Sequence, residues 1–121
     1  MSAKILLVED HLQNRKNIAY CLRTEGYQVN EACNGKEAIE LLNNDQFDLV
    51  LADIVMPELN GLYLLRHLRS AAPAIPVVLM SGHSLDPQQI LKEGATDFIA
   101  KPLRLDELLE KLKSALSRRT L

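Results

Sequence analysis

Hydrophobic positions along the chain fall into five short runs that predict β-strands. Several are continuously apolar rather than alternating, such as KILLV at Lys4–Val8 and PVVLM at residues 76–80. Continuous apolar runs are typical of strands that are covered on both faces, as in a parallel sheet. We therefore predict strands over residues 4–8, 27–32, 47–52, 76–80 and 98–100.

Between these runs, apolar positions recur with the period of an α-helix. This periodicity predicts helices over residues 12–25, 35–42, 60–70, 87–93 and 105–116. Asn34 and Asp86 are suitable N-caps for two of them, and Gly94 is a suitable end for the short fourth helix. Repeated strand–helix alternation implies right-handed crossovers. The predicted fold class is α/β, a doubly wound five-stranded parallel sheet with five helices on its two faces, forming a three-layer sandwich.

Composition narrows the function without naming it. The 121 residues carry 14 Lys+Arg against 16 Asp+Glu, a formal charge of −2, which is too balanced for a typical nucleic-acid-binding surface. No apolar run is long enough to cross a membrane, and the N-terminus does not resemble a signal peptide. Cys21 and Cys33 lack the spacing of a metal site, so we expect free thiols and a cytoplasmic protein. The length predicts a single domain, residues 1–121.

The candidate chemistry lies just after the predicted strands. Glu9 and Asp10 follow the first strand, Asp53 the third, Ser81 the fourth and Lys101 the fifth. Taken singly, each has an ordinary structural explanation as a helix cap, a turn or a bend. In a parallel sheet, however, the carboxyl ends of the strands meet at one edge, where ligands bind. Three carboxylates there repel one another unless a cation such as Mg²⁺ intervenes, and a hydroxyl and an ammonium complete a set suited to phosphoryl transfer.

One further motif makes the pattern specific. From Asp53 the sequence reads D-x-x-M-P-x-x-N-G, and Gly94-Ala95 and Lys101-Pro102 follow at suitable spacings. With the Glu9-Asp10 pair and Ser81, the chain resembles over its whole length the receiver domain of bacterial two-component response regulators. The resemblance implies a flavodoxin-like sheet with strand order 2-1-3-4-5, as in chemotaxis regulators. It also implies a phosphorylation-controlled signalling switch rather than an enzyme.

The resemblance assigns a role to each site residue. Asp53 corresponds to the phosphate acceptor, and Lys101 and Ser81 to the groups that contact the phosphoryl group. A cis Lys101–Pro102 peptide is implied, and Ser81 with Phe98 corresponds to the conformational switch; Phe98 is alternatively an ordinary core residue. The implied cofactor is Mg²⁺, with Mn²⁺ as a possible substitute. Its implied ligands are Asp10, Asp53, Glu9 through water, and the backbone carbonyl of Val55.

The implied partners are proteins. A histidine kinase or histidine phosphotransfer protein donates the phosphoryl group, and a downstream protein or an output domain beyond this sequence reads it; neither nucleic acid nor membrane is contacted directly. The first helix, with Asn14 and Arg15 near the site, corresponds to the docking face for the donor. Alternatively, Arg15, Lys16 and Arg23 form a solvated helix face.

One segment and two positions depart from or tune the common pattern of the family. The segment 81–94 is about two residues short, which puts in doubt the common dimer through the fourth helix. Val55 and His83 flank the path of water to the acyl phosphate. Because Val55 is apolar and cannot orient water, the sequence favours a long-lived phosphorylated form, with His83 either tuning its lifetime or lying exposed without a role.

Two other classes of function share part of this sequence pattern. A haloacid-dehalogenase-like phosphohydrolase also uses an aspartate at a strand end, but it needs a second acid two residues later, where this chain has Val55. A phosphorylation-independent interaction domain would not need the complete set of acids, hydroxyl and lysine.

Overall fold

A five-stranded parallel sheet is the centre of the computed structural model, which describes residues 2–54, 61–72, 74–82 and 86–118. In these residues the strand order is β2-β1-β3-β4-β5, as predicted. The strands are β1 Lys4–Val8, β2 Gln28–Ala32, β3 Leu49–Asp53, β4 Val77–Ser81 and β5 Asp97–Ala100. All pair in parallel, so their carboxyl ends share one edge of the sheet.

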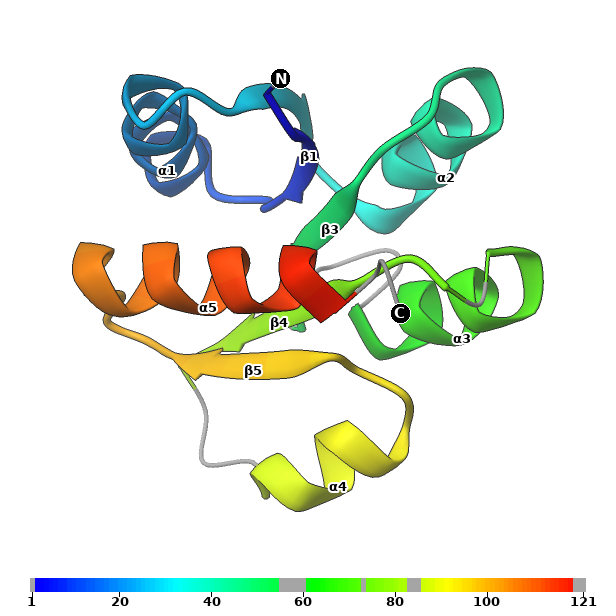
Figure 1. Cartoon of the computed structure of the whole chain (residues 1–121). Helices are drawn as coiled ribbons and strands as arrows, with labels where there is room; N and C mark the ends of the chain where they lie inside the picture. Colours follow the sequence, from blue (N-terminus) through cyan, green and yellow to red (C-terminus); the bar gives the residue numbers. More distant parts are fainter. Residues whose placement is uncertain (1, 55–60, 73, 83–85, 119–121) are drawn as a thin grey trace.

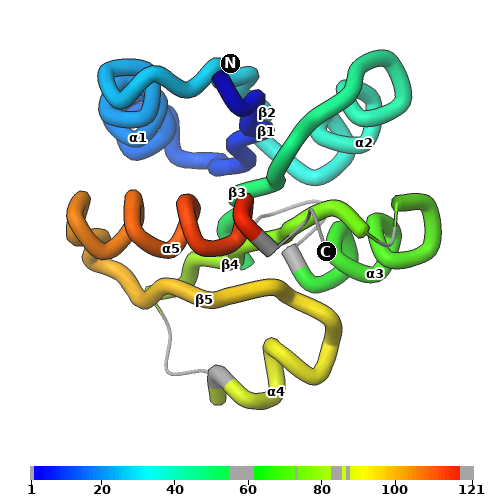
Figure 2. The backbone as a smooth tube through the Cα atoms, viewed as in Figure 1, coloured from blue at the N-terminus to red at the C-terminus, as the bar shows by residue number. Residues whose placement is uncertain are grey.

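Helices cover both faces of the sheet (Figure 1). Helices α1 and α5 pack on one face, and α2 and α3 pack on the other. The backbone view shows the short α4 at the edge formed by β5 (Figure 2). The helices are α1 Leu12–Thr24, α2 Gly35–Asn44, α3 Gly61–Ala71, α4 Pro87–Lys92 and α5 Leu105–Arg118. This arrangement confirms the predicted doubly wound sandwich, including the short fourth helix.

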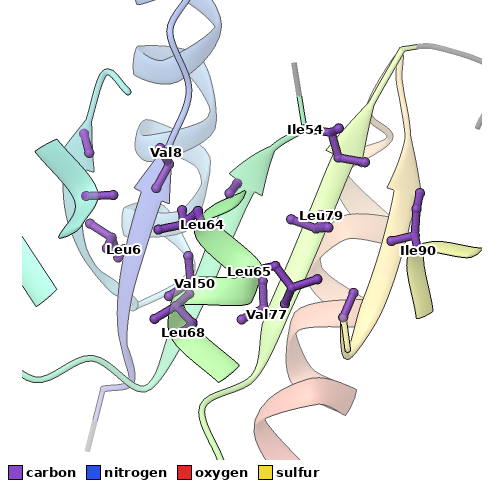
Figure 3. Packing of buried hydrophobic residues seen from close by; sticks show 14 residues of the cluster. Leu6, Val8, Val50, Ile54, Leu64, Leu65, Leu68, Val77, Leu79 and Ile90 are labelled. Carbon is purple, nitrogen blue, oxygen red and sulfur yellow. The ribbon is translucent and has the colours of Figure 1, made fainter. Parts of the chain in front are cut away.

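The continuous apolar runs supply two cores at once. In β1, Leu6 and Val8 point toward α2 and α3, whereas Ile5 and Leu7 point toward α1 and α5. Alternate residues of a strand face opposite sides of a sheet, so a strand buried on both sides must be apolar throughout. Figure 3 shows the first core, where Leu64 and Leu68 of α3 lie over the strands. No helix among the described residues is long and apolar enough to cross a membrane.

Two strand ends differ from the prediction by one residue. Asp53 and Ser81 were placed just after their strands, but each is the last residue of its strand. The parallel ladder extends to them because Asp53 pairs with Met80 and Ser81 pairs with Ala100. The backbone of both residues is thereby held by the regular hydrogen bonding of the sheet rather than by a loop.

Gly94 is a specific end signal for α4. Its φ of 108° is left-handed, and a β-carbon there would lie 3.2 Å from Cγ of Arg69. The Arg69 guanidinium cannot move away freely, because Nε donates to the Gly94 carbonyl and Nη1 donates to the Ile75 carbonyl, each at 2.8 Å. The hydrogen bond from Arg69 to the Gly94 carbonyl therefore connects α3 to the end of α4.

Replacing Gly94 with alanine is expected to cost more than replacing another left-handed glycine. Gly26 has a φ of 95°, but a β-carbon there would meet nothing within 4 Å. Gly26→Ala should therefore cost only the backbone strain, about 1–2 kcal/mol. Gly94→Ala should cost roughly 1 kcal/mol more because the new methyl crowds Arg69. Urea unfolding measures both values, and equal losses would show that Arg69 yields without cost.

Candidate functional site

Three carboxylates gather at the carboxyl edge of the sheet, as predicted. Glu9 and Asp10 directly follow β1, and Asp53 ends the neighbouring β3. One ligand oxygen from each lies within 4.8 Å of the others. Glu9 is 1% exposed and Asp53 is 5% exposed, whereas Asp10 is exposed to solvent. The cluster thus combines two buried carboxylates with one exposed carboxylate.

The Lys101 ammonium balances the two buried acids. Its Nζ lies 2.9 Å from Oε1 of Glu9 and 2.6 Å from Oδ2 of Asp53. Lys101 directly follows β5, its backbone N–H donates to the Ser81 carbonyl at 2.8 Å, and its peptide bond to Pro102 is cis, as the sequence implied. A flexible side chain is therefore aimed at the acids from a fixed backbone.

The electrostatics of the pocket follow from burial and crowding. Burial raises the pKa of Glu9, and the nearby Asp53 charge raises it further, while the His11 backbone N–H and Lys101 act in the opposite direction. Burial alone would lower the pKa of Lys101, but its bonds to Asp53 and Glu9 outweigh burial and raise that pKa. The ammonium therefore stays protonated, and one ammonium stands against three carboxyl groups, which favours the binding of a further cation.

The backbone around Glu9 is held by its neighbours. Its N–H donates to the Ala32 carbonyl at 3.0 Å, and its Oε2 accepts the His11 N–H at 3.0 Å. His11, not Asp10, is the N-cap of α1, with its Nδ1 accepting the Asn14 N–H at 3.3 Å. The alternative explanation of Asp10 as the N-cap of α1 is therefore wrong, and the Asp10 carboxylate belongs to the acidic cluster.

Ser81 and Phe98 lie on the adjacent strands β4 and β5. Ser81 is 1% exposed at the end of β4. Phe98 lies in β5, two residues before the partner of Ser81 in the ladder, and its half-buried ring packs against the core that also contains Ile90 of α4. Strand β5, which pairs with the strand that ends in Ser81, thus also contributes Phe98 to the core near α4.

The donor set fits a hard divalent cation. Each of the three clustered residues offers carboxylate oxygen, and among the described residues neither sulfur nor imidazole joins them. Carboxylate oxygen donors with a solvent-exposed member are features that Mg²⁺ sites use. Lys101 occupies the side nearest Glu9 and Asp53, so a metal would share Asp53 with the ammonium.

Comparison with known proteins identifies the family. The sequence profile of the response regulator receiver domain matches residues 5–113. The chain belongs to the response regulator receiver domain family. Receiver domains of response regulators are phosphorylation-controlled switches in two-component signalling, and they interact with histidine kinases or phosphotransfer proteins.

Individual relatives agree in sequence and in fold. The response regulator MprA of Mycolicibacterium vanbaalenii is 34% identical in an alignment of 122 positions, which covers 99% of this chain and 53% of MprA. A receiver domain protein from Clostridium thermocellum has a TM-score of 0.92 at 28% identity, covering 98% of this chain and 97% of that one. NtrX from Brucella abortus has a TM-score of 0.92 at 33% identity, covering 99% of this chain but 28% of NtrX. This receiver domain spans about half the length of MprA.

Five of the site residues named from the sequence are brought together by the receiver fold. The structure places Glu9, Asp10, Asp53, Ser81 and Lys101 at one edge. Val55, named as a carbonyl ligand, and His83, named for tuning the lifetime, lie outside the described residues. Cys21 and Cys33 are free thiols, as predicted.

Sequence reasoning missed a cluster of charges next to the receiver site. Glu31 of β2 meets three cations of α1: Arg15 at 3.2 Å, Lys16 at 3.1 Å and Arg23 at 3.2 Å. Arg15 is only 14% exposed, so the solvated-face explanation is wrong for it, although Lys16 at 58% fits. A single glutamate in a strand gives no signal in the sequence that three cations converge on it.

Glu31→Gln is expected to remove a pH-dependent part of the stability. Burial alone would raise the pKa of Glu31, but hydrogen bonds from Lys16 and Arg15 outweigh burial and lower it. The free energy of unfolding of wild type should exceed that of the variant by about 1 kcal/mol at neutral pH. The pKa of Glu31 is lower in the folded state than in the unfolded state. The difference in the free energy of unfolding therefore has its full size above the unfolded pKa of about 4.3, and it decreases as the pH falls through the folded pKa.

Denaturant unfolding at several pH values measures this gap between Glu31→Gln and wild type. The control is Glu40→Gln, which changes an exposed glutamate of α2 and should stay within a few tenths of a kcal/mol of wild type throughout. A gap that stays constant or widens in acid would contradict the assignment of the stabilisation to ionised Glu31.

Proposed function

We propose that this receiver domain accepts a phosphoryl group on Asp53 in a Mg²⁺-dependent reaction and then changes a protein-binding surface. The observation that carries the proposal is the buried Asp53 carboxylate, which lies 2.6 Å from the Lys101 ammonium and within a cluster of metal-binding oxygens. A nucleophile, a fixed cation and a group of metal-binding oxygens at one edge of the sheet are the parts that phosphoryl transfer needs.

The metal would be held by Asp10, Asp53, Glu9 through water and the carbonyl of Val55. Mg²⁺ is the proposed ion, with Mn²⁺ as a substitute. When bound, the cation neutralises negative charge on the carboxylates and on phosphoryl oxygens, so that two anionic groups can approach each other.

The reaction forms one bond and breaks another at phosphorus. An Asp53 carboxylate oxygen attacks the phosphorus of a phosphohistidine, the new O–P bond forms, and the N–P bond breaks with its electron pair left on the imidazole nitrogen. Lys101 donates a charge-assisted hydrogen bond to a phosphoryl oxygen, and the Ser81 hydroxyl donates to another. This receiver catalyses only its own phosphorylation and dephosphorylation and is not an enzyme acting on a separate substrate.

The switch follows from the new charge. A phosphoryl group brings about −1.5 to −2 charge where one carboxylate had −1. Ser81 moves toward this group, and the Phe98 ring turns inward into the space released beside β4. Because Phe98 packs against the core near α4, its movement changes the surface formed by α4, β5 and α5.

The donor protein docks beside α1. A cavity of about 360 Å³ lies between α1 and the start of α5, and its lining includes Glu9 and Lys101 of the site together with Asn14, Ile18 and Leu108. A largely apolar cavity that reaches Lys101, the partner of Asp53, suits a histidine kinase or histidine phosphotransfer protein. A downstream protein or an output domain reads the changed surface, with no direct contact to nucleic acid or membrane.

The domain organisation and lifetime are further parts of the proposal. Residues 1–121 form one receiver domain that works in the cytoplasm. The apolar Val55 favours a long-lived phosphorylated form, and His83 tunes that lifetime. The relatives found in the comparisons include response regulators, and the haloacid dehalogenase alternative gains no support from them.

The test is intact-mass measurement after incubation with a small acyl phosphate. With Mg²⁺ the chain should gain the mass of one phosphoryl group, and with a chelator it should gain none. A phosphomonoester should not be turned over, because the proposed reaction is stoichiometric. Absence of the adduct with Mg²⁺ would refute the function, and continuous phosphomonoester hydrolysis would favour the phosphohydrolase.

A further inference from the structure

Arg15 connects the acid pair to the neighbouring strand. Its Nη1 donates to the carbonyl oxygen of Glu9 at 3.1 Å, and its Nε donates to Oε1 of Glu31 in β2 at 3.2 Å. Both charged side chains are largely covered, with 14% of Arg15 and 13% of Glu31 exposed. The guanidinium is thus held at two points in a protected position.

The carbonyl that Arg15 binds has a special place in the chain. It belongs to the peptide group that joins Glu9 to Asp10, and this group is planar. The Glu9 N–H is bound to the Ala32 carbonyl at 3.0 Å, so both backbone polar groups of Glu9 are fixed. Fixing this plane helps to set the direction in which the chain continues to Asp10, whose side chain is exposed.

We propose that Arg15 is a positioning residue for metal binding, which aims the Glu9–Asp10 segment through the Glu9 carbonyl while Glu31 orients the guanidinium. The inference rests on the proposed function, because it concerns the same metal site. It adds a residue that touches neither metal nor phosphoryl group. Groups that orient metal ligands from outside the coordination sphere commonly change affinity by 10- to 100-fold when removed, so an effect of about tenfold is expected.

The sign of the effect separates positioning from simple charge. Arg15 carries a positive charge near an acidic cluster, so a purely electrostatic role predicts that its removal strengthens cation binding. A positioning role predicts the opposite, because Asp10 loses its fixed direction. Arginine is suited to this task because its planar fork can bind two acceptors at once, which lysine cannot do with the same geometry.

The experiment titrates the full chain with Mg²⁺ alone and follows the amide NMR signal of Asp10. Arg15→Met should raise the Mg²⁺ dissociation constant by about tenfold. Arg15→Lys keeps the charge and should still weaken binding several-fold. The control is Lys16→Met, which removes another cation from Glu31 but has no bond to Glu9 among the described contacts; its binding should be unchanged or slightly tighter.

A second variant tests whether Glu31 acts through Arg15. Glu31→Gln should weaken Mg²⁺ binding, and the double variant with Arg15→Met should be no weaker than Arg15→Met alone, because residues that act as one unit are not additive. Thermal unfolding of each variant verifies folding, and Arg15→Lys provides the measurement if Arg15→Met does not fold.

The outcomes are distinguishable. An unchanged or lower dissociation constant in Arg15→Met and Arg15→Lys, with wild type binding Mg²⁺ and gaining its phosphoryl group, would overturn the positioning role alone. A wild-type chain that neither binds Mg²⁺ nor is phosphorylated would overturn the proposed function and this inference together.

Discussion

Asp53→Asn is expected to gain no phosphoryl group when it is incubated with Mg²⁺ and a small acyl phosphate. Asparagine has nearly the shape of aspartate, but its neutral amide lacks the anionic oxygen that attacks phosphorus. The substitution also removes the partner 2.6 Å from the Lys101 ammonium, so Lys101 is left with Glu9. Intact mass spectrometry should show the variant unmodified at times when wild type is fully converted.

The matched control for Asp53→Asn is Asp106→Asn. Asp106 lies in the first turn of α5, and its side chain is 76% exposed. This change alters the net charge by the same amount but leaves the pocket intact, so phosphorylation should proceed as in wild type. An adduct that persists in Asp53→Asn would place the acceptor elsewhere in the chain.

Lys101→Met is expected to slow phosphorylation while tightening Mg²⁺ binding. Loss of a fixed donor to developing negative charge typically costs about 100-fold or more in rate. Loss of the ammonium also leaves the buried Glu9 and Asp53 carboxylates without the Lys101 cation, so these carboxylates should bind a metal ion more tightly. Without metal, the variant should be less stable than wild type, and Mg²⁺ should stabilise it by a larger increment than wild type.

Phosphorylation time courses and Mg²⁺ titrations measure the two effects separately. Lys113→Met is the control, because Lys113 lies exposed on α5 and its loss removes the same charge from the chain. Both quantities should stay near wild type in the control. A Lys101→Met variant that reacts at the wild-type rate, or that binds Mg²⁺ more weakly, would contradict the balance of charges described for the pocket.

Much of the fold follows from local patterns in the sequence. Runs such as Ile5 to Val8 must be apolar throughout because alternate residues enter different cores, and this pattern already predicts a parallel sheet. The site follows from the same argument, since a parallel sheet brings Asp53 and Lys101 to one edge although they lie 48 positions apart. The strand order itself rested on the family resemblance.

The missed features depend on side chains that meet only after folding. His11 replaces Asp10 as the helix cap, an outcome that residue preferences do not favour. Arg15 lies one turn into α1, and the sequence left both a solvated face and a docking face open for it. Its bonds to Glu9 and Glu31 require the exact placement of α1 against β1 and β2, which no sequence period encodes.

The central claim is that Asp53 is the acceptor, and chemical mapping tests it most directly. Borohydride reduces an aspartyl phosphate to homoserine, so the phosphorylated wild-type chain can be reduced, digested and sequenced by mass spectrometry. The account predicts homoserine at position 53 only, and none when Mg²⁺ is withheld during phosphorylation. Homoserine at another aspartate, or phosphate retained on Ser81 or a histidine, would contradict it.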